Sequence, residues 1–459
     1  MSYDAVFDLV SITLEGTEIS ELDDMIEEMV NEQALLEDDS LEHPLFPSFP
    51  KRHVCPLRSL VTARQTIVEQ EDVTEHRTDM QGVAWREGER GRKAYRCYRN
   101  RFGPPMYMFY HGSRTLEENQ QALDYANNEY FRFRYTDTNI HCSHRHPQLR
   151  NLVVATSKND VYYLYENSIQ HWSPQLRTST TILGSPLKNA LARVPHRITT
   201  MAAMDHNLLV GGEDGSFTFM NLQTCQKPVF GTFTDGEYLE INSIEMSHSR
   251  TGASHAYVST NDYRVRCVDL NSLETYVEYP TEWFVNYTAQ SPDAHMIAIV
   301  GDGLDGQVLS VNSKEVIATL KGHQRFSFSC AWSPDSRMLA TGSDDQSTCI
   351  YDTRKMSEPL HVLGSDIRES VRALRYSACG RYLVMAEERD YIHIVDTTSD
   401  YKQAQKIDFI GDISGISLTP DAEGLFVGVS SVDFSSLLEF ERLYQGSDAS
   451  QSDPWGSLY

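Results

Sequence analysis

Short stretches of alternating apolar and polar residues recur along most of the chain, and turn residues separate them. Phe326–Trp332 is one such stretch, and Met338–Thr341 follows it after a Ser-Pro-Asp turn. Alternation with a period of two is typical of β-strands that bury one face. The pattern therefore predicts an all-β protein built from many short strands.

The turn signal recurs at a nearly constant interval. Five similar triplets begin at Ser247, Ser291, Ser333, Ser377 and Thr419, spaced 44, 42, 44 and 42 residues apart. Proline presets the backbone of a tight turn and Asp or Ser bonds nearby amides, so Ser-Pro-Asp suits the link between two strands. A period of about 40–45 residues is typical of the four-stranded blades of a β-propeller.

We expect seven blades, although the last one lacks an outer strand of its own. Phe131–Tyr135 could supply that strand, which would close the ring and remove exposed sheet edges. Residues 173–195 look like an insertion in the first blade. The blades are predicted to begin near Ile140, Ile198, Ile241, Trp283, Phe326, Val371 and Ile413.

One repeat resembles the WD40 repeat. It reads Gly322-His323, then Ser333-Pro334-Asp335, then Thr341-Gly342-Ser343-Asp344-Asp345, then Ile350-Tyr351-Asp352. The resemblance implies a seven-bladed WD40-type β-propeller of the transducin-like family. It also implies a hydrogen-bonded chain through His323, Thr341, Asp345 and Tyr351, with Tyr351 where the family usually has Trp.

The resemblance extends over residues 70–443. Residues 79–85 (DMQGVAW), 131–134 (FRFR) and 148–162 (QLRNLVVATSKNDVY) are similar to little-characterised WD-repeat proteins of fungi and plants. Such a likeness implies the fold and leaves the biological role open.

Charge is concentrated at the start of the chain. The formal net charge is −25, and residues 1–50 hold 14 acids without Lys or Arg. We therefore predict an acidic, partly helical extension over 1–50, an irregular arm with a short helix over 51–129, the propeller over 130–443 and a disordered tail over 444–459. The eight cysteines are scattered, and the first residues carry acids where an export signal carries basic residues, so we expect a cytoplasmic or nuclear protein.

Within the acidic extension, residues 17–36 combine acids with apolar residues at helical spacing. Leu22, Ile26 and Met29 fall on one face of the predicted helix. A disordered tail explains the charge, whereas a docking helix explains both features.

The arm contains a basic segment over residues 86–101. Seven Lys or Arg, including Arg92, Lys93, Arg96 and Arg99, alternate with tyrosines. Basic and aromatic residues together can bind phosphates and stack bases. Because the whole chain is acidic, we favour an arm packed on the propeller over a nucleic-acid site.

Two further patterns could indicate a dinucleotide site or a metal site. Gly301–Gly306 matches G-x-G-x-x-G, but a strand-like stretch follows where a dinucleotide site needs a helix, so we predict a turn. His141, Cys142, His144 and His146 are close in sequence but have no second ligand group at zinc spacing, so we expect no metal or cofactor. Without an established catalytic motif, we expect no enzyme activity.

We expect a non-catalytic scaffold or adaptor that binds other proteins as a monomer within a larger complex, with no membrane attachment. Two alternatives stay open. In one subfamily of ubiquitin-ligase receptors a blade ends Trp-Asp-x-Arg, and Tyr351-Asp352-Thr353-Arg354 resembles it, which would assign Asp352 and Arg354 to the ligase adaptor. The other alternative is a nucleic-acid-binding protein that uses residues 86–101.

Overall fold

The computed structural model divides the chain into two compact units, residues 1–110 and 111–459. It describes residues 60–102, 120–126, 128–144, 146, 149–184, 194–195, 197–224, 227–234, 239–364 and 367–444. The predicted docking helix with Leu22, Ile26 and Met29, and the predicted tail apart from its first residue, lie outside these residues.

The described part of the first unit holds a small sheet and two helices, more regular structure than the irregular arm that was expected. β1 (Val61–Arg64) pairs antiparallel with β3 (Val83–Trp85). The elements of the first unit are β1 (Val61–Arg64), β2 (Ile67–Glu69), α3 (Gln70–Thr74), β3 (Val83–Trp85) and α4 (Glu89–Phe102).

The Asp79–Trp85 motif organises this sheet. One carboxylate oxygen of Asp79 accepts the amides of Gln81 and Val83 at 2.9 and 3.0 Å, and the other accepts Trp85 Nε1 at 2.8 Å. Gly82 has a φ of +76°, and a Cβ there would lie 2.1 Å from Gln65 O. Only glycine fits this turn, which accounts for the motif.

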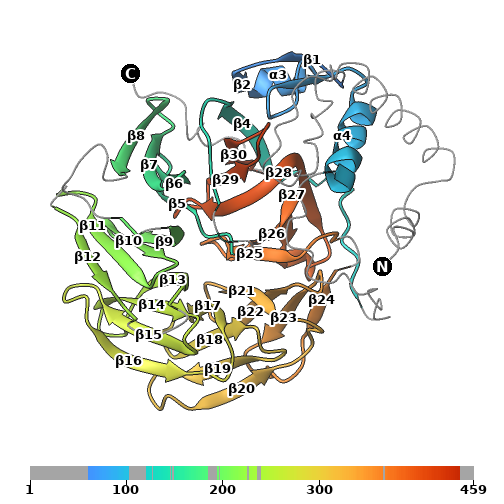
Figure 1. Ribbon diagram of the computed structural model, residues 1–459. Coiled ribbons are helices and arrows are strands. Elements are labelled where there is room, and N and C mark those ends of the chain that lie inside the picture. The colour runs from blue at the N-terminus through green and yellow to red at the C-terminus, as the bar shows by residue number, and fades with distance from the viewer. Residues whose placement is uncertain are drawn as a thin grey trace, which may run out of the picture. The chain divides into compact units, whose positions relative to one another are not determined.

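The second unit consists mainly of antiparallel sheets arranged around a ring (Figure 1). Five of these sheets have four strands, and each strand pairs with the next one in sequence. Blade one is β5 (Val153–Ser157), β6 (Asp160–Tyr165), β7 (Ser168–Ser173) and β8 (Thr178–Leu183), and blade two is β9 (Ile198–Met204), β10 (Asn207–Gly212), β11 (Ser216–Asn221) and β12 (Val229–Thr232). Blade three is β13 (Ile241–His248), β14 (Ser254–Thr260), β15 (Arg264–Asp269) and β16 (Thr275–Pro280), and blade four is β17 (Val285–Gln290), β18 (Met296–Gly301), β19 (Gly306–Ser310) and β20 (Val316–Leu320). Blade five is β21 (Ser327–Trp332), β22 (Met338–Ser343), β23 (Thr348–Asp352) and β24 (His361–Leu363).

The remaining strands of this unit form one continuous sheet in the order β25-β26-β27-β28-β29-β30-β4. β28 is long: its first part pairs with β27 and its last part pairs with β29. Between the two parts lies Gly411, with a φ of +138°. The strands of this continuous sheet are β4 (Phe131–Asp137), β25 (Val371–Tyr376), β26 (Tyr382–Glu387), β27 (Arg389–Asp396), β28 (Ala404–Leu418), β29 (Gly424–Ser430) and β30 (Ser436–Arg442). The 3₁₀ turn η3 (Thr397–Ser399) lies between β27 and β28.

The all-β propeller fold that the sequence predicts is confirmed. Division of the continuous sheet at Gly411 would give two further four-stranded units and hence seven blades, and this number stays a prediction. The G-x-G-x-x-G pattern forms the turn between β18 and β19, as expected. No helix of the described residues is long and apolar enough to cross a membrane.

The Ser-Pro-Asp turns owe their shape to side-chain hydrogen bonds. The Ser333 hydroxyl donates to Asp335 Oδ1 at 2.6 Å and accepts the amide of Met338 at 2.9 Å. Ser291 makes the same two contacts with Asp293 and Met296. These short-range bonds explain why the triplets mark the link between the first two strands of a blade.

Three expected boundaries are wrong. The first blade begins at Val153 and not near Ile140, because residues 140–144 form no strand. The proposed insertion over 173–195 contains β8, the fourth strand of blade one. In blade three the turn begins at Ser249, whose hydroxyl accepts the amide of Ala253, and Ser247 still belongs to β13.

The apolar cores lie between neighbouring sheets. One cluster joins blade five to the β25–β28 region through Ala340, Ile350, Leu374 and Leu383. The first strands of the sheets lie side by side, and β28 meets β5, so the row closes on itself. At that junction a Cβ on Gly415 would lie 2.7 Å from the Val153 amide, so the two strands approach too closely for a side chain.

β4 pairs with β30, as expected from the sequence of Phe131–Tyr135. Thr136 Oγ1 donates to Leu437 O at 2.9 Å, and Arg132 and Arg134 pair with Glu441 and Glu439 at 2.6 and 3.1 Å. Trp172 of blade one donates its indole N–H to the same Glu439. The added strand thus also fixes the contact with the neighbouring blade.

We predict that a chain of residues 51–459 is soluble and monomeric, whereas a chain of residues 138–459 aggregates. The shorter chain lacks β4, so it exposes the edge of β30 and the apolar side chains beneath it. Size-exclusion chromatography with light scattering distinguishes the two. A monomeric 138–459 chain would show that β4 is dispensable.

Candidate functional site

The structure brings three of the four predicted network residues of blade five together. His323 Nδ1 lies 3.0 Å from Asp345 Oδ2, and His323 Nε2 lies 2.7 Å from Thr341 Oγ1. Asp345 also accepts the amides of Gln324 and Ser347 at 2.8 and 3.0 Å. The network thus ties the segment before β21 to the loop between β22 and β23.

Tyr351 takes a different partner. Its phenol is buried and donates to Lys321 O at 2.9 Å. It therefore fastens β23 to the backbone just before His323.

The hydrogen bonds of the Asp345 carboxylate to His323, Gln324 and Ser347 set its pKa. Burial alone would raise the pKa of Asp345, but the hydrogen bond and charge of His323, with the Ser347 and Gln324 bonds, outweigh it and lower that pKa. Burial likewise opposes protonation of His323, but its contacts with Cys349 and Asp345 raise its pKa well above the ordinary value. Both groups hold the segment before β21 to the loop between β22 and β23.

We predict that Asp345→Ala lowers the free energy of unfolding, because it leaves His323 and the Gln324 amide without their acceptor. His323 is buried, and a buried donor left without an acceptor costs about 1–3 kcal/mol. Urea unfolding measures the change, and Glu315→Ala, an equal change of charge at an exposed position of blade four, serves as the control. An Asp345→Ala protein as stable as the control contradicts the structural role.

Asp352 and Arg354, the proposed ligase contacts, bond to each other. Arg354 Nε lies 2.9 Å from Asp352 Oδ1, and this contact lowers the pKa of Asp352 to about 2. Asp352 Oδ1 also accepts the Arg354 amide at 2.9 Å. Asp269 and Asp396 accept amides of the following turn in the same way, so a local structural reason exists for the Asp at this position. The Arg354 side chain is 85% exposed and stays accessible.

The four basic residues of the predicted patch lie on α4. Arg92, Arg96 and Arg99 are three or four residues apart, so they share a face of the helix, and Lys93 is exposed. Tyr95 and Tyr98 are only 3% and 6% exposed. Because these rings are buried, they offer no surface on which bases could stack.

The histidine-rich segment does not converge on one point. Cys142 is buried in an apolar cluster, and the His141 ring lies 5.9 Å from that of Tyr165. His146 Nδ1 accepts the amide of Leu149, while its Nε2 lies 3.6 Å from Glu240 Oε1. Among the described residues no group of three or more His, Cys, Asp or Glu could hold a metal ion.

A charged cluster that sequence reasoning missed lies at one end of the second unit, where β22 and β26 end and β25 begins. Arg372 Nη2 lies 2.7 Å from Glu388 Oε2 and 3.6 Å from Asp344 Oδ1. Arg389 Nε lies 3.7 Å from Glu369 Oε1. We call Arg150, Asp344, Glu369, Arg372, Glu388 and Arg389 the charged cluster.

Arg150 is the most buried cation of the charged cluster. Its side chain is fully buried, and Nη1 donates to His146 O and Leu149 O at 2.8 and 3.2 Å. Its Nε and Nη2 have no hydrogen-bond partner in the part of the chain that the structure describes. Burial lowers the pKa of Arg150 to about 10, against the opposing effect of Glu388.

A second polar group links the first strands of several sheets. Arg375 of β25 donates to Asn151 Oδ1 at 3.1 Å, and its guanidinium lies 5.7 Å from the Tyr287 ring centroid. Tyr287 in turn donates to Glu245 Oε2 at 2.9 Å. Burial raises the pKa of Glu245.

One signal in the sequence could have indicated the charged cluster. Four charged residues in a row, Glu387 to Asp390, directly follow the apolar stretch Tyr382–Ala386. Such a run at a strand end could equally be a solvated turn. The pairing of β25 with β26 brings Arg372 to this run, and the packing of a neighbouring sheet brings Arg150.

We predict that Glu369→Gln changes how stability depends on pH. Burial, against the opposing effect of Arg389, raises the pKa of Glu369 from 4.5 to about 7. The folded state therefore binds this proton more tightly than the unfolded state, and stability falls as pH rises from about 4.5 to 7. The variant should gain stability relative to wild type at pH 8 compared with pH 5, as measured by urea unfolding. An equal difference at both pH values would contradict the assignment.

The fold and its repeats can now be compared with known proteins. The family model "WD domain, G-beta repeat" matches residues 314–352, the end of blade four and most of blade five. The match identifies a WD repeat in this region, and the sheets around it have the architecture of a WD40-type β-propeller.

Two curated relatives share this type of repeat region. The chain is 27% identical over 149 residues to histone acetyltransferase type B subunit 2 of Schizosaccharomyces pombe, covering 29% of this chain and 34% of the relative. It is 28% identical over 166 residues to eukaryotic translation initiation factor 3 subunit I of Culex quinquefasciatus, covering 32% and 48%. The chain thus spans a third to a half of these relatives. A closer kinship with fungal and plant WD-repeat proteins stays a prediction.

Proposed function

We propose that this protein is a non-catalytic scaffold of the cytoplasm or nucleus, a monomer that binds protein partners within a larger complex. The general role of WD repeats in protein interaction supports this proposal. Both relatives are named as subunits, which agrees with membership of a complex.

The observation that carries the proposal is the charged cluster. It gathers carboxylates and arginines at one end of the ring. At its rim Arg368 is exposed, and 30% of the Arg325 side chain is accessible beside Asp344. Mixed charges at a rim steer and select a protein partner more than they add affinity.

The opposite end of the blades offers a matched control. Arg250 lies in the turn between β13 and β14, and Lys314 lies between β19 and β20. Both are exposed. Because strands alternate in direction, these turns are at the other end of the sheets from Arg325 and Arg368.

We predict that Arg325→Glu/Arg368→Glu loses the partners that the wild-type protein captures, whereas Arg250→Glu/Lys314→Glu keeps them. Affinity purification from the organism's own cells, followed by mass spectrometry, compares the three proteins. Circular dichroism melting checks that each folds, and Arg368→Glu alone replaces the double variant if that variant does not. Identical captured proteins in all three samples would exclude this end as the partner site.

Further variants test the two alternatives. Capture of a ubiquitin-ligase adaptor that depends on Arg354 would favour a receptor role. Salt-dependent binding of RNA or DNA, abolished by changes at Arg92, Lys93, Arg96 and Arg99, would favour the nucleic-acid alternative.

A further inference from the structure

Residues 120–126, which we call the strap, lie along the sheets of the second unit as an extended segment. Its side chains alternate: Leu123 is buried and Gln121 and Tyr125 are half-buried, whereas Ala122, Asp124 and Ala126 are exposed. This alternation is that of a β-strand with one covered face.

The strap backbone pairs with two different sheet edges. The Gln121 amide donates to Val362 O at 2.8 Å, and Gln121 forms a parallel bridge with Leu363 of β24. Further along, the Asp124 amide donates to Lys402 O at 2.8 Å, and Asp124 O accepts the Ala404 amide at 2.9 Å. The strap therefore connects blade five to the start of β28.

The amide group of Gln121 is fully used. Its Nε2 donates to Tyr401 O at 2.7 Å and to Asp400 O at 3.2 Å. Its Oε1 lies 2.9 Å from His361 Nδ1. A side chain with both donor and acceptor is therefore required at this position.

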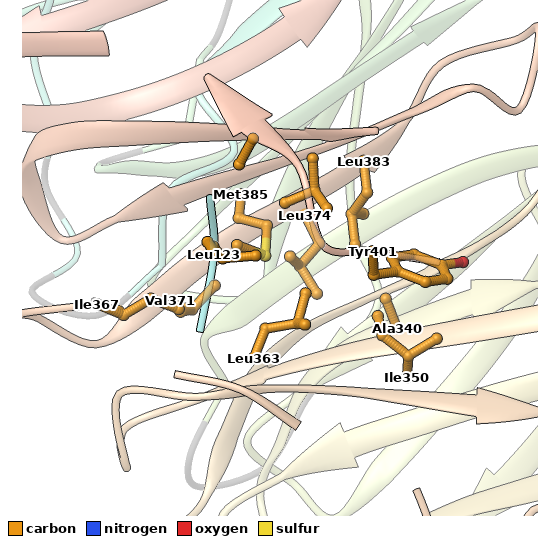
Figure 2. Close-up of a cluster of buried hydrophobic side chains, with 12 residues drawn as sticks. Leu123, Ala340, Ile350, Leu363, Ile367, Val371, Leu374, Leu383, Met385 and Tyr401 are labelled. Carbon is orange, nitrogen blue, oxygen red and sulfur yellow. The ribbon is translucent and has the colours of Figure 1, made fainter. Parts of the chain in front are cut away.

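Leu123 belongs to the apolar cluster between blade five and the β25–β28 region. Figure 2 shows it pointing in among Met385, Val371 and Ile367. The cluster also contains Leu363, and Leu123 is only 6% exposed. An aliphatic side chain fits this position, and a charged one does not.

Tyr125 ends a buried polar chain. Its hydroxyl lies 2.7 Å from His393 Nδ1, and His393 Nε2 lies 2.6 Å from Glu387 Oε1. His393 and Glu387 are both fully buried. The other oxygen of Glu387 accepts the amides of Arg368 and Glu369 at 3.1 and 2.7 Å. A phenol at this position gives His393 Nδ1 a hydrogen-bond partner.

Five consecutive residues make all of these contacts, through backbone pairing with sheet edges and through alternate side chains. Linear peptides bind sheet edges by the same means. We propose that this surface is a binding site for an extended peptide with an amide, an aliphatic and a phenol side chain at alternate positions. In the isolated chain its occupant is the strap itself, bound within the same molecule, which excludes a peptide of a partner protein. This site goes beyond the proposed function, since it uses the outer strands and not the end of the ring.

The test uses the full-length protein and a fluorescein-labelled peptide of residues 120–126. Leu123→Asp should release the strap and so free the site, whereas Ala122→Asp places the same charge on the exposed side of the strap. In fluorescence anisotropy we expect the peptide to bind the Leu123→Asp protein at least roughly tenfold more tightly than wild type or Ala122→Asp, a difference of about 1.4 kcal/mol. A peptide with Asp in place of Leu should bind none of the three. Equal binding of the labelled peptide to all three proteins would overturn the proposal.

A second measurement covers the case in which Leu123→Asp does not fold. Tyr125→Phe removes only one hydroxyl, and it should speed hydrogen exchange of the strap amides by roughly two- to tenfold, the loss of about one hydrogen bond. Exchange in β13–β16 should not change. Unchanged exchange in the strap would overturn the proposal. A wild-type dimer in light scattering would instead show that two copies exchange straps, which contradicts binding within one molecule.

Discussion

Closure of the ring is the constraint on which the rest of the second unit depends. Each sheet covers its apolar faces with its two neighbours, so an open row would leave two faces and one strand edge in water. β4 pairs with β30, and β28 meets β5, so residues more than 240 positions apart in the chain hold the ends together. The contacts of Glu439 with Arg134 and Trp172 lie at this junction.

Buried polar groups then fix how neighbouring sheets sit against each other. Thr199, Asn242 and Asn286 each occupy the second position of a first strand and donate to a backbone carbonyl at the start of the next sheet's first strand. These bonds recur at the repeat spacing, which explains a regular ring from repeats that share few identical residues. A polar group buried without such a partner would be costly, so the bonds also disfavour other arrangements.

Local signals in the sequence were enough to predict the propeller fold. The turn triplets and strand alternation act within a few residues, so they predicted the propeller and the role of Phe131–Tyr135. The same reasoning misplaced the first blade, because Ile140 and Cys142 are apolar and buried without belonging to a strand. It also missed the strap, because its short alternation is weak beside that of the blades. The docking helix over residues 17–36 stays a prediction.

The sequence by itself determined the strands, the repeat and the partnership of His323 with Asp345, because each depends on contacts that are local or repeated in a recognisable pattern. The tertiary structure alone decided the charged cluster, the bond from Tyr351 to Lys321 and the path of the strap. The charged cluster joins Arg150 to Arg372 and Glu388, and the strap joins Leu123 to Met385. Strand pairing brings Arg372 to Glu388, whereas Arg150 and Leu123 are distant in sequence from their partners and reach them only through tertiary packing.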